Sequence, residues 1–497
     1  MDKVNGIHLY VNIKNILDII KQEEQKDEDL KRTIHRLQTY FVGFTKVIST
    51  FSGQVEKHTG GRSHVVIEIC EDSKNTDIEE ALKTVVACFK FNNDIFNELT
   101  KYTQYNYPDF KIHAGMDYGE YAWYKIEDNV TEDESTTIGG VANNAAKIQS
   151  FAYKDYIYIM DKLYRELPQE FKYKFTELDE SRMEVIKGKI KNSKVYEAKY
   201  NQIFDDSVMN DIDKKLEDVK KRVEEEANKL NISEIDFSDA KVKVDFSKLS
   251  INNNKKLSGG ILCADIRGFT KLFNKNDSNL DDLCDVMQEL YSVMGDSVNE
   301  EEGIKVQYQG DRIVALFNDF NGADPYKIRM LNSAFKLNER IQGLNDRADI
   351  SEKLKKNNIA IGVGCSSGNI IATRLGANGS KDNIILSEAA KAADSSEDDY
   401  AEKNSVVICK QLHDEIVAEA KNSTHIEYKV LQEVFTAIST TGYYSANITY
   451  SEFQKKIDEK KAQEQEEKAK ALFNATILKS SIGEKVNVQT RPWGVKS

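Results

Sequence analysis

Hydrophobic and polar residues follow two different periods along this chain. Apolar side chains recur at steps of three and four over residues 30–51 and 283–298, and this spacing predicts two amphipathic helices with one buried face each. Short apolar runs at 8–12 and 261–265 predict buried strands. Residues 306–317, VQYQGDRIVALF, predict two strands joined by a tight turn. Strands and helices mixed in this order indicate an α+β protein.

The same order of elements occurs twice. Each half of the chain carries a buried strand, an amphipathic helix and a hairpin, at 8–12, 30–51 and 54–69 in the first half and at 261–265, 283–298 and 306–317 in the second. A repeat of this length predicts two homologous domains rather than a solenoid. We place these domains at 1–200 and 257–448, with a linker at 201–256 and a charged helix and tail at 449–497.

Three segments at the borders of these domains have patterns of their own. Residues 208–230 are highly charged and predict an exposed, solvated helix inside the linker. Residues 451–476 predict a second charged helix. Residues 184–200, around Lys187 and Lys189, predict a final strand pair that closes the first domain.

Composition narrows the range of functions. The 497-residue chain has a net charge of −13, which argues against broad binding to nucleic acid or to anionic membranes. No apolar run reaches the length of about 18 residues that a membrane span needs, and the first residues lack a signal-peptide pattern. We therefore expect a cytoplasmic protein with no membrane partner and no nucleic-acid partner. The six scattered cysteines indicate reduced core residues rather than disulfides or zinc ligands.

Two aspartates are the main candidates for chemistry. Asp265 ends the strand at 261–265, and Asp311 lies at the turn of the hairpin at 306–317. Two such carboxylates side by side suit a hard cation, Mg²⁺ or Mn²⁺, and a turn at Gly268 leaves backbone N–H groups for phosphate. The pair therefore indicates phosphoryl chemistry with two metal ions. The alternative is structural, because Asp commonly occupies strand ends and turns.

Five short motifs resemble those of the class III nucleotide cyclase homology domain. They are ADIRGFT at 264–270, GDR at 310–312, IGVGCSSG at 361–368, VANNAAK at 141–147 and IKGKIKNSKVYEA at 186–198. Each half of the chain resembles one such domain. The resemblance implies an α+β fold of two ferredoxin-like (βαββαβ) domains that form an intramolecular pseudodimer and are joined by a charged helical linker.

The two copies differ at positions that hold metal in this family. The second copy keeps both carboxylates, Asp265 and Asp311, whereas the first copy has Asn12 and Gly61 in their places. The resemblance implies that two divalent cations, Mn²⁺ or Mg²⁺, bind between the aspartates, with the Ile266 carbonyl group as a further ligand.

The first copy keeps the other half of the expected site. It has Asn143 followed by Lys147, and we align these with Ser387 and Lys391 of the second copy. Because the active site of this family lies between two domains, the losses are complementary and imply one working site, in which the two aspartates face the asparagine and the lysine. The alternative is that the first copy is a decayed scaffold.

The resemblance assigns further roles around this site. Asn143 is expected to orient the ribose. Lys147 stands where the family usually has an arginine, so it supplies charge without a bidentate fork. Lys187 and Lys189 are candidates for triphosphate binding, or are solvated charges at a strand edge. The β- and γ-phosphates are expected to lie on the backbone of Arg267, Gly268, Phe269 and Thr270.

Two interpretations of the base follow. Lys57 and Thr136 fall at the base-reading positions of adenylate cyclases, which favours ATP as the substrate and cyclic AMP as the product. Cytoplasmic domains of this kind, without receptor modules, instead resemble the pyrimidine cyclases of bacterial Pycsar antiphage systems. That resemblance implies conversion of CTP or UTP to 3′,5′-cyclic CMP or cyclic UMP plus diphosphate, and a separate effector protein that the product activates.

Two functions without catalysis are also compatible with the sequence. The tandem domains could bind nucleotides as a regulatory module, because the family's arginine is a lysine here. They could also form a structural interaction protein that uses the charged helices at 208–230 and 451–476. The intact pair Asp265 and Asp311 favours an enzyme. The linker is long enough for pairing within one chain or in a further homo-oligomer.

Overall fold

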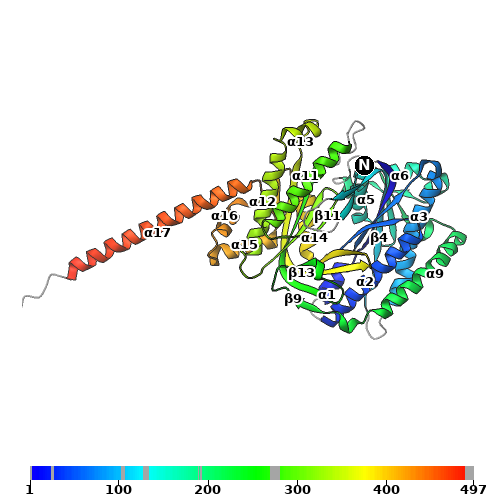
Figure 1. Ribbon diagram of the computed structural model, residues 1–497, viewed down its shortest axis with the longest axis horizontal. Coiled ribbons are helices and arrows are strands. Elements are labelled where there is room, and N and C mark those ends of the chain that lie inside the picture. The colour runs from blue at the N-terminus through cyan, green and yellow to red at the C-terminus, as the bar shows by residue number, and fades with distance from the viewer. Residues whose placement is uncertain are drawn as a thin grey trace, which may run out of the picture.

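Two mixed β-sheets, each covered by helices, make up the body of this computed structural model (Figure 1). The structure describes residues 3–23, 27–101, 107–126, 134–187, 190, 193–268 and 280–486. The sheets carry the two cyclase-like domains, here called the N-terminal and C-terminal domains. The α+β prediction is therefore confirmed.

The N-terminal domain is built on an eight-stranded sheet with the order β2-β3-β1-β4-β6-β8-β7 and with β5 paired to β4. Its strands are β1 (Val4–Ile13), β2 (Gln54–Thr59), β3 (Arg62–Glu68), β4 (Ile112–Ile126), β5 (Glu134–Ile138), β6 (Tyr156–Met160), β7 (Thr176–Glu177) and β8 (Val195–Lys199). Its α-helices are α1 (Ile16–Glu23), α2 (Asp27–Thr50), α3 (Lys74–Lys90), α4 (Asn97–Leu99), α5 (Gly140–Phe151), α6 (Asp161–Glu166), α7 (Gln169–Lys172) and α8 (Glu180–Lys187).

The C-terminal domain repeats this order as β11-β12-β10-β13-β15-β17-β16, with β14 paired to β13 and β9 to β10. Its strands are β9 (Phe237–Asp239), β10 (Asn254–Arg267), β11 (Ile304–Gln309), β12 (Arg312–Asn318), β13 (Ala360–Ala377), β14 (Ser380–Leu386), β15 (Ser405–Cys409), β16 (Thr436–Ala437) and β17 (Tyr443–Ala446). Its helices are α11 (Leu280–Asn299), α12 (Tyr326–Leu344), α13 (Ala348–Lys353), α14 (Glu388–Ser395), η6 (Ser396–Tyr400), α15 (Lys410–Asn422), α16 (Glu427–Val434) and α17 (Tyr450–Val486).

Strand register shows that the two halves are equivalent residue by residue. Asn12 lies opposite Arg62 across β1 and β3, and Asp265 lies opposite Arg312 across β10 and β12. Both β2–β3 and β11–β12 contain a bulge at the same place, because the register shifts at Glu56 in one hairpin and at Val306 in the other. The predicted repeat of strand and hairpin is therefore present in the fold.

Reciprocal arms join the two domains. Ile138 of the β4–β5 arm lies in the hydrophobic core of the C-terminal domain, and Leu375 and Ile384 of the β13–β14 arm lie in that of the N-terminal domain. In Figure 1 the yellow strands of this second arm reach the blue helix α2. Burial of apolar side chains on both arms stabilises the pairing within one chain.

Hydrogen bonds related by the same symmetry accompany the arms. The Glu134 carboxylate accepts the Tyr308 N–H at 3.1 Å, and the Asp382 carboxylate accepts the His58 N–H at 2.8 Å. Glu134 on β5 and Asp382 on β14 occupy equivalent positions of the two arms. The interface therefore repeats one contact twice.

The charged helix expected in the linker is α9 (Asp206–Lys229), and it is not solvated on every side. Its apolar residues form one stripe that is buried in the N-terminal core: Ile212, Leu216, Val219 and Val223. The prediction of an exposed helix was wrong because the abundant charges occupy the other faces and hide a regular spacing of three and four. Further along the expected linker, β9 pairs with β10 of the C-terminal sheet.

The strand pair expected at 184–200 is a helix followed by one strand. Residues 184–187 belong to α8, and β8 begins at Val195. Met183, Ile186 and Ile190 recur at helical spacing and are buried with Ile148 of α5. Packing of this apolar face against α5 favours the helix over a strand.

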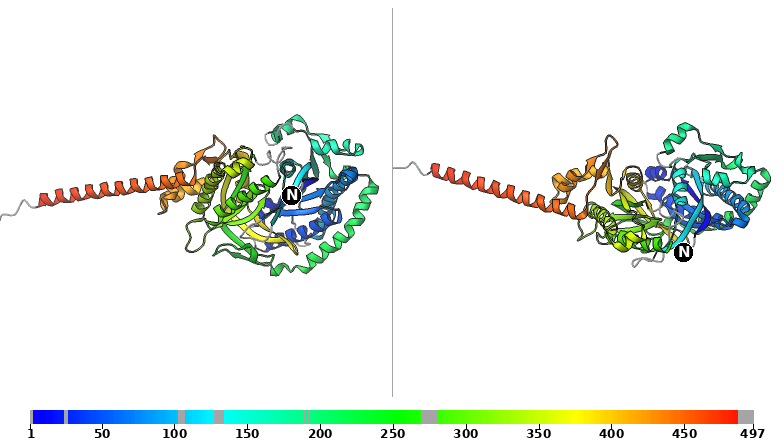
Figure 2. Two further views of the ribbon diagram at one scale, coloured as in Figure 1. Left: turned by 45° about the horizontal axis from the view of Figure 1, so that its top comes forward. Right: turned by 90° about the horizontal axis from the view of Figure 1, so that it is seen from above.

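The second charged helix is confirmed as α17. Phe453 and Ile457 near its start are buried against the C-terminal domain. Figure 2 shows the rest of the helix extending away from the body in both views. No helix in the described part of the chain has the length and apolar character needed to cross a bilayer.

Replacement of Asp382 by Asn is expected to change how stability depends on pH. Burial raises the pKa of Asp382 to about 6, although the His58 N–H opposes the shift. The folded state then keeps a proton that the unfolded state loses, so stability falls as pH rises from about 4 to 6, by about 1.4 kcal/mol for each pKa unit. The midpoint of thermal unfolding of Asp382→Asn should therefore rise relative to wild type between pH 4.5 and 7.5.

Asp349→Asn is the matched control, because the Arg347 hydrogen bond lowers the pKa of this exposed carboxyl. Its midpoint relative to wild type should stay constant between pH 4.5 and 7.5, because this carboxyl is ionised in both the folded and the unfolded state above about pH 4. A constant difference between Asp382→Asn and wild type would contradict the role given to burial in the interface.

Candidate active site

Asp265 and Asp311 lie next to each other on the C-terminal domain. Asp265 is near the end of β10, Asp311 lies in the turn between β11 and β12, and the Ile266 N–H donates to the Asp311 carbonyl oxygen at 3.3 Å. Burial raises the pKa of both carboxyl groups, and the charge of Asp311 raises that of Asp265 further. The Asp311 charge opposes ionisation of Asp265, and a cation bound beside the two carboxylates would relieve this repulsion.

Two arginines form ion pairs beside the two aspartates. Arg267 forms an ion pair with Asp265 at 2.9 Å and with Glu397 of η6 at 2.5 Å. Arg312 forms one with Asp394 at 2.5 Å. The Arg267 side chain passes over Gly362, where a Cβ atom would lie 2.4 Å from the guanidinium and would displace it from its two carboxylate partners.

The donor set fits a hard divalent cation. The described residues contain no cluster of three or more His, Cys, Asp or Glu side chains able to hold a metal ion. The carboxylate pair would hold Mg²⁺ or Mn²⁺ together with the Ile266 carbonyl group, water and substrate phosphate oxygens, as such ions prefer. Asp265 and Asp311 are adjacent, and their role as metal ligands stays a prediction.

The equivalent positions of the N-terminal domain are filled with neutral groups. The Asn12 amide contacts the His113 ring at 3.1 Å, and this ring also contacts Gln149 at 2.8 Å. Ile16 lies against Gly61 so closely that a Cβ there would be 2.6 Å from it. These contacts leave the N-terminal copy without a carboxylate at either position.

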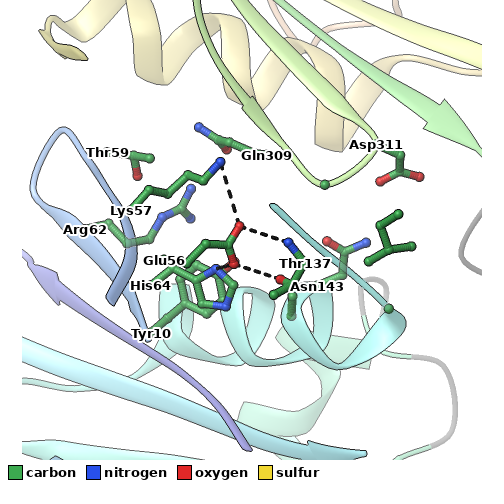
Figure 3. A pocket seen from close by; sticks show the side chains of 14 residues that line it. Tyr10, Glu56, Lys57, Thr59, Arg62, His64, Thr137, Asn143, Gln309 and Asp311 are labelled. Carbon is green, nitrogen blue, oxygen red and sulfur yellow. Dashed lines mark hydrogen bonds and ion pairs between the residues drawn. The ribbon is translucent and has the colours of Figure 1, made fainter. Parts of the chain in front are cut away.

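Helix α5 of the N-terminal domain forms the opposite wall. Asn143 is exposed on α5 and lines the same pocket as Asp311, as Figure 3 shows. Lys147 lies one turn further along the helix, and its charge lowers the pKa of Asp265. The two predicted halves of the site therefore meet across the domain interface.

The alignment of α5 with the second copy needs a correction. Gly115 packs against Ala145 and Gln149 of α5, and its equivalent Gly364 packs in the same way against Ala393 and Glu397.

Asn143 therefore corresponds to Lys391, and Lys147 to Ser395. Ser387, which we expected opposite Asn143, instead caps α14 by accepting the Ala389 N–H. The expected alignment was wrong by one helical turn, because positions four residues apart share a helix face.

The two expected base-reading residues are engaged in contacts between the domains. The Lys57 ammonium group donates to the Tyr308 carbonyl at 2.5 Å and to Glu134 at 3.4 Å. The Thr136 hydroxyl donates to Glu56 at 2.9 Å and accepts the Gly310 N–H at 3.1 Å. Lys57 lines the pocket, while Thr136 secures the hairpin that carries Asp311.

Several pocket residues were not found from the sequence. Glu56 accepts hydrogen bonds from Thr136 and Thr137 and pairs with His64 at 2.7 Å. Burial would raise the pKa of Glu56, but His64, Lys57 and Thr137 hold it well below its usual range. Tyr10, Thr59, Arg62 and Gln309 complete this part of the pocket (Figure 3). A signal was present, since polar residues alternate with apolar ones at 7–12 in an otherwise buried strand.

The remaining predicted residues lie at or beyond the ends of the described segments. Gly268 is exposed with φ +101°, a left-handed turn that favours glycine at the end of β10. Phe269, Thr270 and Lys189 lie outside the described residues. Lys187 is the last residue of α8, and its side chain lies outside the described part of the structure.

Comparison with known proteins shows that the C-terminal domain is similar to a known family. Residues 252–426 match the family model described as the adenylate and guanylate cyclase catalytic domain. No curated protein sequence matches the chain at a significant level.

Solved structures match the fold of one or both domains. The crystal structure of a class III adenylyl cyclase-like ATP-binding protein from Pseudomonas aeruginosa matches with a TM-score of 0.69 and 17% identity, over 91% of this chain and 90% of that one. The adenylyl cyclase CyaB from P. aeruginosa covers 39% of this chain and 95% of its own, with 16% identity and a TM-score of 0.31. The guanylyl cyclase Cya2 covers 39% and 93%, with 15% identity and a TM-score of 0.31.

Divalent cations are expected to stabilise the protein through Asp265 and Asp311. A ligand at 100 times its Kd adds about 2.7 kcal/mol to the free energy of unfolding, so Mn²⁺ should raise the midpoint of thermal unfolding. The rise should be larger at pH 8 than at pH 6, because the raised pKa of both carboxyl groups lets protons compete with the ion at the lower pH. Asp265→Asn and Asp311→Asn should abolish the rise, and the exposed control Asp346→Asn should keep it. An equal rise in all four proteins would contradict the assignment.

Thr136→Val is expected to weaken the metal site without removing a ligand. The change removes the acceptor of the Gly310 N–H and one of the donors to Glu56. The unsatisfied N–H lowers the free energy of unfolding by about 1–3 kcal/mol. Thr137→Val also removes a donor to Glu56 but leaves Gly310 untouched. The Mn²⁺-induced rise in unfolding midpoint should shrink in Thr136→Val and persist in Thr137→Val, and equal behaviour of the two would refute the link to Asp311.

Proposed function

We propose that the protein is a pyrimidine nucleotide cyclase, because residues 252–426 match the adenylate and guanylate cyclase catalytic domain. It converts CTP or UTP to 3′,5′-cyclic CMP or cyclic UMP and diphosphate. The placement of Asp311 and Asn143 on opposite walls of one pocket carries the proposal. Each domain then supplies one half of a single site.

The reaction forms a bond between the ribose O3′ and the α-phosphorus and breaks the bond from that phosphorus to the β-phosphate oxygen. The 3′-hydroxyl proton is lost and diphosphate leaves. Divalent cations held by Asp265 and Asp311 lower the pKa of the 3′-hydroxyl and neutralise phosphate charge when bound.

The opposite wall orients the substrate. The Asn143 amide NH2 donates to the ribose ring oxygen, and its amide oxygen accepts from a ribose hydroxyl group. The Lys147 ammonium group faces the developing negative charge on the α-phosphate. The ammonium group acts as a point charge, whereas an arginine would present a planar fork of donors. The rate of the Lys147→Arg variant therefore tests whether hydrogen-bond geometry at this position affects catalysis.

The engagement of Lys57 supports a pyrimidine substrate. In the adenylate cyclase interpretation its ammonium group reads adenine, but here it donates to Tyr308 and Glu134 across the interface. Thr136, the second expected adenine contact, is likewise held by Glu56 and Gly310. Neither side chain is directed at a base in this arrangement.

An adenylate cyclase is the second candidate. Lys57 does line the pocket, and one structure with the same fold is described as an ATP-binding protein. Rearrangement of Lys57 on substrate binding would restore the expected contact with adenine. Binding of nucleotide without turnover, as in a regulatory module, is the third.

The biological role follows from the pyrimidine product. We assign the cyclic nucleotide the role of a second messenger in bacterial antiphage defence, where it activates a separate effector protein. The support for this role is the resemblance of the sequence to Pycsar cyclases.

Turnover with four nucleotides tests the proposed function. Purified protein is incubated with ATP, GTP, CTP or UTP and with Mn²⁺ or Mg²⁺, and the products are resolved by mass. Cyclic CMP or cyclic UMP is expected as the main product. Asn143→Ala should lower its rate by about 100-fold or more, because truncated orienting groups lose transition-state alignment.

Lys391→Ala is the matched control, since Lys391 occupies the position equivalent to Asn143 on the side without a metal pair. Its rate should equal that of wild type. Cyclic AMP as the main product would replace the pyrimidine proposal with the adenylate one. Absence of product, with nucleotide binding retained in calorimetry, would favour the regulatory module.

A further inference from the structure

The guanidinium group of Arg62 is an unused cation in the pocket. The Arg62 side chain makes no hydrogen bond or ion pair with the described residues, and its guanidinium lies over the Tyr10 ring, 5.5 Å from the ring centroid. The neighbouring cations Arg267, Arg312 and Lys305 all pair with carboxylates. A cation left without an anionic partner inside a substrate pocket is directed at the substrate.

A rigid platform positions this group. Tyr10 stacks on His64 with ring centroids 4.2 Å apart and an interplanar angle of 8°. His64 is fixed in turn by Glu56 at 2.7 Å and by His8 at 2.8 Å. Arg62 begins β3 immediately after the Gly60-Gly61 turn, so its backbone is held in the sheet. Figure 3 draws it near Lys57 and Thr59 at one end of the pocket.

We infer that Arg62 reads the base and that it selects cytosine. This inference rests on the proposed nucleotide function. A guanidinium group presents a fork of donors and no acceptor, so it matches two adjacent acceptors. Cytosine offers such a pair at O2 and N3, whereas uracil carries a donor at N3 and adenine alternates a donor with an acceptor.

Guanine is the remaining competitor, because its O6 and N7 also form an adjacent acceptor pair. Cytosine has one ring and guanine has two, so cytosine fits between the two hairpins that line the pocket with less displacement of either domain.

The rest of the pocket is compatible with cytosine. Both oxygens of Glu56 already accept hydrogen bonds from Thr136, Thr137 and His64, so this carboxylate is not the acceptor for the exocyclic amine. Thr59 and Gln309 lie on opposite hairpins of the pocket, and their side-chain oxygen atoms can accept a hydrogen bond from that amine.

Nucleotides without a 3′-hydroxyl separate base reading from turnover. Binding of 2′,3′-dideoxy-CTP, -UTP, -ATP and -GTP is measured by calorimetry with Mn²⁺ on wild type, Arg62→Ala and Arg62→Lys. Wild type should bind the cytosine compound at least about tenfold more tightly than the others, and Arg62→Ala should lose about 10- to 100-fold for this compound alone. Arg62→Lys keeps the charge but lacks the fork, so it should lose the preference as well.

Arg165→Ala, at an exposed arginine of α6, is the matched control and should bind like wild type. The unfolding midpoint of each variant identifies any loss of folding, and Arg62→Lys keeps the test valid if Arg62→Ala is unstable. Equal weakening for all four nucleotides would overturn the inference in favour of a phosphate contact. A cytosine preference that survives in both Arg62 variants would also overturn it.

The two proposals fail separately. A cytosine preference that depends on Arg62, without cyclic product from CTP, would refute the cyclase function and keep the inference. Cyclic product without such a preference would keep the cyclase and refute the inference.

Discussion

The exchange of arms between the two domains is the constraint on which the site depends. The β4–β5 arm brings Thr136 to the Gly310 N–H and Glu134 to the Tyr308 N–H, at 3.1 Å each. Both bonds hold the hairpin that ends in Asp311. Because Asp311 and Asn143 belong to different domains, any slip between the arms would separate these two residues. Apolar burial of both arms makes such a slip costly.

Charge differs sharply between the two equivalent ends of this interface. At one end Asp265, Asp311 and Glu397 are balanced by Arg267 and Arg312, and burial raises the pKa of all three acids. At the other end Asn12, His113 and Gln149 satisfy one another as neutral groups. Cation binding is therefore favoured at the end with the carboxylates and not at the neutral end. Duplication allowed this division, since a single site needs one set of metal ligands and one ribose wall.

The pocket between the arms combines rigid and adaptable parts. Glu56, His64 and Tyr10 form a closed network whose members are buried and paired, and such networks fix geometry well. Lys57 and Arg62 are long cations on the same hairpin. Lys57 is held by the partner domain, whereas Arg62 rests on an aromatic ring. This difference is the reason why we assign base recognition to Arg62 rather than to Lys57.

The sequence by itself determined the duplicated fold, the two aspartates and the loss of their counterparts at Asn12 and Gly61. These follow from local periodicity and from residue types in strands, which short-range sterics and burial govern. It did not determine the alignment of α5, since residues a turn apart share a face, and the contact of Gly115 and Gly364 with the helices decided it. The sequence also did not reveal the buried apolar stripe of α9, because charged residues dominate that segment. Strand register and the opposing domain bring Glu56, His64 and Arg62 together in the pocket. The sequence did not predict this, because contacts between residues far apart in the chain leave no local pattern.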